Sequence, residues 1–309
     1  MSLCLQLQAA LDADLEALAG APAVDERDVL ETLLFVYDLH LAPLDRLGGC
    51  EHLANHPVVA EIKWRFDRWL IDALDVRLAG RAALPADTVE AVRHIAMQHD
   101  DAVYDWLATT ADWYQLRMFL AVEGGPDAGF DDLVALCQVG IRGGAKVVLG
   151  ENYWDEMGRG DAARVHTTLH DKLVDAIGMP TLSRPELPLS ALFRSALSGL
   201  LATNHWLQPE MLGALGVIEQ SAGPRCRRVV RAMERLGAPE DAMAFYREHA
   251  TTDPRHGKEW LDRVIGPLVA EHPEWGERIV RGALWRRDVD CRLLRDLHEV
   301  VATRELELA

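Results

Sequence analysis

The spacing of apolar residues is the feature that most restricts the fold of this chain. In stretch after stretch, apolar side chains recur every three or four residues, as at Leu30, Leu34, Tyr37 and Leu41. This repeat is typical of one face of an α-helix. Alternating β-branched runs bounded by tight turns, which would indicate strands, are scarce. The sequence therefore predicts an all-α fold.

Clusters of glycine, proline and small polar residues predict where the helices end. They lie at residues 20–24, 48–56, 80–87, 124–129 and 180–188. The break at 80–87 is the best candidate for a domain boundary, because it holds a helix-ending glycine, a proline and, in Asp87 or Thr88, an N-cap for the next helix. We therefore expect an N-terminal helical subdomain over residues 1–85 and a helix bundle over residues 86–309.

Charge and composition restrict the partners of the protein. The 309 residues include 32 Lys and Arg against 49 Asp and Glu, a net charge of -17, which should repel nucleic acids and anionic membrane surfaces. The chain shows neither a signal peptide at its start nor an uncharged apolar run of about 18 residues, so we expect a soluble, cytoplasmic protein. Its five cysteines include no CxxC pair and are expected to be reduced, mostly buried thiols.

Acidic and imidazole side chains lie on apolar helix faces at several places. Glu123 follows Leu116, Phe119 and Leu120 by seven, four and three residues, so its carboxylate is aimed inward. The same spacing puts three more residues on apolar faces: Glu219, His166 and His249. Singly, each could be a core histidine with one hydrogen bond or a glutamate paired with an arginine. Together they favour a metal centre, because buried carboxylates are costly unless cations neutralise them, and helix bundles hold two irons in this way.

The segment GENYWDEMGRGDAARVHTTLH carries the first of two motifs. Glu156 and His166 stand ten residues apart, which on an unbroken helix is about 15 Å of rise and two different faces. Gly158 and Gly160 are the residues that a break between them would need. In the alternative interpretation, MGRGD only ends a helix and Glu156 is exposed.

The second motif is YREHATTDPRHGKEW, with His249, Asp253 and His256 at offsets of four and three residues. These offsets place the three side chains on one helix face, and the donor set suits iron, manganese or zinc. Pro254 predicts local unwinding near Asp253, which would let both histidines reach one ion.

Four features follow one another along the chain. They are an inward Glu, the motif DE-x-G-x-G with a His ten residues after its Glu, a further inward Glu, and the motif H-x3-D-x2-H. The set resembles the haem-oxygenase-like diiron oxidases and oxygenases, also called iron-containing redox enzymes, over about residues 90 to 270. The resemblance implies a haem-oxygenase-like helix bundle without haem, and two ferrous ions held by seven metal-binding and catalytic residues: Glu123, Glu156, His166, Glu219, His249, Asp253 and His256.

Several neighbours of these residues have two interpretations. Asn152, Asp155 and Arg159 would orient the ligands, or else be solvated. Tyr153, Trp154 and Tyr246 would line the substrate cavity, although packing is the simpler interpretation.

By the same resemblance, the protein would be a non-haem diiron enzyme with O2 as cosubstrate. The two ferrous ions would supply two electrons to O2. The substrate would be a small organic metabolite, oxidised by N-oxygenation or by oxidative C–C cleavage of an amino-acid or fatty-acid-like molecule. The sequence does not determine the substrate, whether the protein forms a homodimer, or whether manganese replaces one iron. Two alternatives are a non-catalytic iron-binding or protein-interaction module on the same fold, and a metal-free relative acting on thiamine-like or quinone-precursor molecules.

Overall fold

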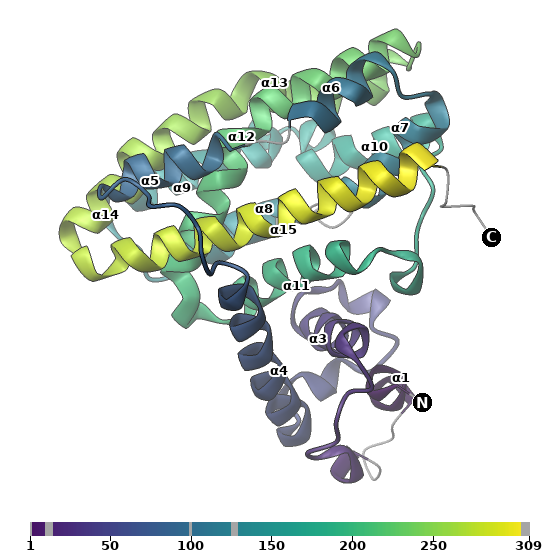
Figure 1. Ribbon diagram of the computed structural model, residues 1–309, viewed down its shortest axis with the longest axis vertical. Coiled ribbons are helices and arrows are strands. Elements are labelled where there is room, and N and C mark those ends of the chain that lie inside the picture. The colour runs from purple at the N-terminus through teal and green to yellow at the C-terminus, as the bar shows by residue number, and fades with distance from the viewer. Residues whose placement is uncertain (1, 10–14, 99–100, 125–128, 304–309) are drawn as a thin grey trace.

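The computed structural model describes residues 2–9, 15–98, 101–124 and 129–303. Within these ranges the chain forms helices and short turns and contains no strand, so the all-α prediction is confirmed. The helices, with the labels of Figure 1, are α1 Leu3–Ala9, α3 Glu26–Leu41, α4 Pro57–Val76, α5 Thr88–Ala96, α6 Asp101–Thr109, α7 Trp113–Glu123, α8 Phe130–Cys137, α9 Gly143–Glu156, α10 His166–Ile177, α11 Leu189–Thr203, α12 Gln208–Arg235, α13 Glu240–Glu259, a π-helical turn Trp260–Ile265, α14 Gly266–Glu271 and α15 Gly276–Thr303.

Helix α12 lies at the centre of the bundle. It packs against α13 on one side and α15 on another, and α6 also lies against it. Helix α11 lies between α15 and the N-terminal helix α3, and the C-terminal end of α4 meets α15 directly, where Trp285 donates to Asp75 at 2.8 Å (Figure 1). Of the described helices, none has both the length and the apolar character that a membrane crossing requires.

The predicted helix ends agree with the structure wherever it describes them. The breaks at 20–24, 48–56, 80–87 and 180–188 all lie between α-helices, whereas residues 125–128 of the fourth predicted break lie outside the described residues. Asp87 is the N-cap of α5, and its side chain accepts a hydrogen bond from the backbone of Glu90 at 2.9 Å. All five cysteines are free thiols, three of them buried.

The N-terminal helices are joined to the bundle by a shared apolar core. The cluster that contains Leu33 of α3 also contains Leu197 of α11. At the same contact the ring of Tyr37 lies against Gly199, where a Cβ atom would be only 2.2 Å from Cδ2 of the ring. The division at residue 85 stays a prediction.

The prediction of unwinding near Asp253 is wrong, because α13 runs unbroken from Glu240 to Glu259 with Pro254 inside it. Two contacts explain this. Proline cannot donate to the carbonyl of Ala250 four residues earlier, and Arg227 Nη1 donates to that carbonyl instead, at 3.2 Å. The proline ring fits over Gly223 of α12, where a Cβ would lie 2.8 Å from its Cγ.

Candidate metal centre

Glu156 and His166 meet because the chain breaks between them. Helix α9 ends at Glu156, two short turns follow, and α10 begins at His166. Gly158 has a φ of +60°, and a Cβ on it would lie 2.6 Å from the carbonyl carbon of Arg164, so only glycine fits this turn. His166 Nδ1 lies 2.6 Å from Glu156 Oε2, and Glu156 is only 2% exposed. The predicted break is present, and Glu156 points inward.

Two groups of three side chains share Glu156. Within each group the nearest nitrogen and oxygen atoms all lie within 4.8 Å of one another, and the groups are Glu156 with His166 and His249, and Glu156 with Glu219 and His256. The five residues come from α9, α10, α12 and α13. Because the two groups share Glu156, they adjoin each other, and together they could hold two neighbouring cations.

Two of the seven predicted residues lie outside these groups. Asp253 is close, since its Oδ1 lies 3.9 Å from Nδ1 of His256. Glu123 lines one cavity with Glu156 and His166, but its carboxylate has other partners. Its Oε1 accepts from Arg225 Nη1 at 2.9 Å and from the hydroxyl of Tyr104 at 3.1 Å. The metal-ligand role of all seven residues stays a prediction.

Several acidic side chains lie close together in this interior, and their shifted pKa values show the energetic cost of burying them. Burial and the charge of Glu156 raise the pKa of Glu219 to about 8. Burial, Glu219 and Glu156 raise the pKa of Asp253 well above its ordinary value. Burial alone would raise the pKa of Glu156, but His166, together with His249 and His256, lowers it below its ordinary value. Two divalent cations would remove this repulsion.

His249 and His256 each present a lone pair to the site. His249 donates from Nδ1 to the carbonyl of Phe245 at 2.8 Å, which leaves Nε2 as the acceptor nitrogen. Burial, and after it the neighbouring His166, lower the pKa of His249 to about 4. A neutral imidazole of this kind is the form that binds metals.

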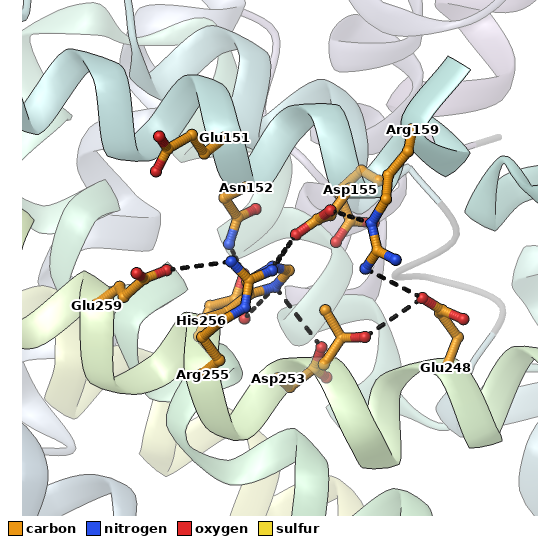
Figure 2. A network of polar contacts seen from close by, with 12 residues as sticks. Glu151, Asn152, Asp155, Arg159, Glu248, Asp253, Arg255, His256 and Glu259 are labelled. Atoms are coloured by element: carbon orange, nitrogen blue, oxygen red, sulfur yellow. Dashed lines mark hydrogen bonds and ion pairs between the residues drawn. The ribbon is translucent and has the colours of Figure 1, made fainter. Parts of the chain in front are cut away.

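Figure 2 shows how the ring of His256 is held. Its Nε2 lies 2.8 Å from Oδ2 of Asp155 and 3.3 Å from Nη2 of Arg255. The carboxylate is the nearer partner and can only accept, so this nitrogen carries the proton. Nδ1 is then the lone-pair nitrogen, buried and without a hydrogen-bond partner among the described residues. Arg159 and Arg255 also donate to Asp155. Although burial opposes them, Arg159 and His256 lower the pKa of Asp155 to about 2.

The unpartnered Nδ1 of His256 shows that this donor set fits a metal ion. Asn152 adds to the fit by donating to Glu219 Oε1 at 2.7 Å, which orients that carboxylate. Asn152 and Asp155 thus contact candidate ligands directly, whereas Arg159 contacts Asp155 and Glu248 and is about half exposed. The orienting role of the three residues stays a prediction.

A cavity of about 80 Å³ adjoins both groups, and its lining includes Tyr246 but neither Tyr153 nor Trp154. Three charged lining residues were missed by sequence reasoning: Asp131, Arg194 and Arg225. Asp131 is in the first turn of α8, and burial followed by Asp132 raises its pKa. Its position three residues before the buried Val134 was the available signal, since the same spacing rule identified the other inward acids.

The chain is similar to known proteins in sequence and in structure. A model of the family described as iron-containing redox enzymes matches residues 117–290, which include all seven predicted site residues. A nitrosourea synthase from Streptomyces achromogenes subsp. streptozoticus is 28% identical over 121 residues. These residues are 38% of this chain and 26% of that protein, so the match spans about a quarter of the relative. A solved CADD-like protein of unknown function from Nostoc punctiforme has a TM-score of 0.47 and 19% identity, and the match covers 79% of this chain and 99% of that one.

Proposed function

Since this chain belongs to the family of iron-containing redox enzymes, we propose that it is a non-haem diiron oxidase or oxygenase that uses O2 to oxidise a small organic metabolite. Family membership agrees with the resemblance drawn from the motifs. The observation that carries the proposal is the pair of metal-binding groups that share Glu156.

In this proposal each group holds one iron. Glu156, His166 and His249 bind the first, and Glu156, Glu219 and His256 bind the second, with Asp253 and Glu123 as the remaining candidates. Two bound ferrous ions would supply two electrons to O2, which ordinary side chains cannot do. The chain's own part is to hold neutral imidazoles through Phe245 and Asp155, and to keep the reacting atoms in a small cavity away from bulk water.

The candidate reactions are N-oxygenation and oxidative C–C cleavage of an amino-acid or fatty-acid-like substrate. The nitrosourea synthase among the relatives supports N-oxygenation as a candidate, since a nitroso group is an oxygenated nitrogen. The matched quarter of that protein supports a shared type of chemistry, and the substrate is a separate question.

The test is to load the protein with ferrous iron without oxygen, expose it to O2, and record oxygen uptake and the oxidation state of the iron. We expect two ferrous ions per chain and oxygen uptake faster than by the same iron in buffer. The Glu156→Ala variant should take up oxygen no faster than buffer. Iron that binds tightly to the wild type but reacts no faster than free iron would favour a non-catalytic iron-binding module.

A further inference from the structure

A second cavity lies between helix α3 and the bundle. Its volume is about 530 Å³, against about 80 Å³ for the cavity at the candidate metal centre, and sites for small molecules usually have about 300–1,000 Å³. Its wall is formed by α3, α8, α10 and α11 and by the connection between α10 and α11. We call it the α3 cavity. The family match begins at residue 117, so the α3 side of this cavity lies outside the matched segment.

Most of the wall of the α3 cavity is apolar. Leucine, valine and methionine side chains from both sides face it, among them Leu34, Leu136, Val174, Met179 and Leu187. A hydrocarbon group that enters such a space and the wall that receives it both lose contact with water, which favours binding.

The charged side chains of the wall favour an uncharged ligand. Arg184 Nη2 lies 2.5 Å from Oδ2 of Asp38, and Asp132 is exposed to water. An anion would have to compete with Asp38 for Arg184, and a cation would have to compete with water for Asp132. Neither competition occurs for a neutral molecule.

His170 is the buried polar group of this wall whose hydrogen bonding is unsatisfied. The hydroxyls of Ser195 and Ser198 donate to carbonyls of their own helix at 3.0 and 3.4 Å, and that of Tyr37 donates to Asp67. His170 is only 7% exposed, and its ring makes no hydrogen bond to a described residue. Burial lowers its pKa, so the neutral ring has one donor and one acceptor nitrogen. A ligand group that pairs with the ring would remove the cost of burying it unpaired.

The α3 cavity and the metal centre are neighbours but separate sites. The ring centroids of His170 and Phe245 lie 5.3 Å apart, and those of Phe245 and His249 lie 4.4 Å apart. His170 lines the α3 cavity, whereas Phe245 and His249 line the cavity at the metal centre. The rings of His170 and Phe245 therefore stand between the two.

We propose that the α3 cavity is a second binding site, for an uncharged molecule with a hydrocarbon body and one hydroxyl or similar hydrogen-bonding group. The body lies among Leu34, Leu136 and Val174, and the polar group pairs with His170. The site requires neither iron nor O2, so this proposal goes beyond the proposed function and does not depend on it.

Displacement of a fluorescent probe from the metal-free protein tests the proposal. The probe N-phenyl-1-naphthylamine is uncharged and becomes bright in apolar surroundings. The competitors are the primary alcohols hexanol, octanol and decanol, with octanoate and octylamine as charged counterparts of octanol. We expect affinity for the alcohols to rise about threefold to fourfold with each added methylene. Octanol should bind at least tenfold more tightly than either charged counterpart.

Two variants locate the bound molecule. Ser195→Phe places a ring in the α3 cavity and should weaken binding of the probe at least tenfold. Thr203→Phe is the matched control: Thr203 also lies on α11 and donates to the carbonyl four residues earlier, at 2.8 Å, but does not line the cavity. It should stay within twofold of wild type. His170→Phe keeps the ring but removes its nitrogens. It should weaken octanol about 2- to 12-fold and leave chlorooctane, which has no hydroxyl, within twofold.

Four results would overturn the proposal: no displacement of the probe by any alcohol, tighter binding of octanoate or octylamine than of octanol, equal effects of Ser195→Phe and Thr203→Phe, or unchanged octanol affinity in His170→Phe. Circular dichroism shows whether each variant folds. If Ser195→Phe does not, Ala202→Leu adds a smaller side chain to the same wall and should weaken the probe at least threefold, with a value within twofold of wild type counting against the site. A chain that binds alcohols but does not react with O2 would refute the proposed function alone.

Discussion

Nδ1 of His166 and Oε2 of Glu156 lie 2.6 Å apart, although they belong to different helices and ten residues of chain separate them. Glu156 also lies in one group with Glu219 and His256. Helices α9, α10, α12 and α13 therefore converge at one carboxylate, and this is the central relationship in the protein.

Because Glu156 belongs to both candidate metal-binding groups, we expect its removal to cost more iron than the removal of any histidine. We expect Glu156→Ala to lose both irons and His249→Ala to lose about one of the two, with the helical circular dichroism of both largely unchanged. Metal analysis after anaerobic loading measures this. Cys137→Ser is the control, since the Cys137 thiol donates to a backbone carbonyl of its own helix. Wild-type iron content in Glu156→Ala would refute the shared ligand.

The turn at Gly158 should tolerate no side chain. Gly158→Ala must accept a left-handed φ, which costs about 1–2 kcal/mol, and must also move the backbone at Arg164, which adds about 1–3 kcal/mol. Gly143→Ala is the matched control, because Gly143 also has a positive φ but has open space around it. Chemical denaturation should show a larger loss of unfolding free energy for Gly158→Ala, together with weaker iron binding because His166 is displaced. Equal losses in the two variants would contradict the steric role.

Asp155 should act on the metal through His256. Asp155→Asn keeps the size of the side chain but can present an N–H to Nε2 and reverse the preferred tautomer of the ring. We expect iron affinity to fall about 10- to 100-fold, measured by competition with a chelator. Glu151→Gln serves as the control, since Glu151 lies one turn earlier on α9 and is exposed. An affinity within twofold of wild type in Asp155→Asn would exclude a positioning role.

The contact between Tyr37 and Asp67 should make stability depend on pH in the alkaline range. Burial and Asp67, which accepts from the Tyr37 hydroxyl at 2.5 Å, raise the pKa of Tyr37 well above 10. A group whose pKa is raised by folding contributes its stability fully below its unfolded pKa of about 10 and loses it as the pH rises further. The unfolding free energy should therefore fall more steeply above pH 10 in the wild type than in Tyr37→Phe.

Urea denaturation at pH 8 and pH 11 checks this difference. Tyr104 and Tyr246 have raised pKa values for the same main reason, burial, so Tyr37→Phe should keep part of the pH dependence. Tyr114→Phe, which changes a half-buried tyrosine, is the control and should behave as the wild type does. Identical slopes in wild type and Tyr37→Phe would show that the hydroxyl contributes nothing.

The sequence by itself determined the helical class, most helix ends and the inward direction of the acids and histidines. Each of these follows from periodicity within one helix or from the residues of one turn, such as Gly158, so neighbours in the chain are sufficient. The motifs were also sufficient to identify the family.

Only the tertiary structure decided how the inward charges are paired. Glu123 and Glu219 look alike on their helices, yet Glu123 meets Arg225, 102 residues away, whereas Glu219 meets Asn152 and His256. Pro254 likewise leaves α13 intact because Arg227 of another helix replaces the missing donor. A buried charge or an unpaired carbonyl takes whichever partner the packing of helices brings within about 3 Å, and no local pattern in the sequence carries that information.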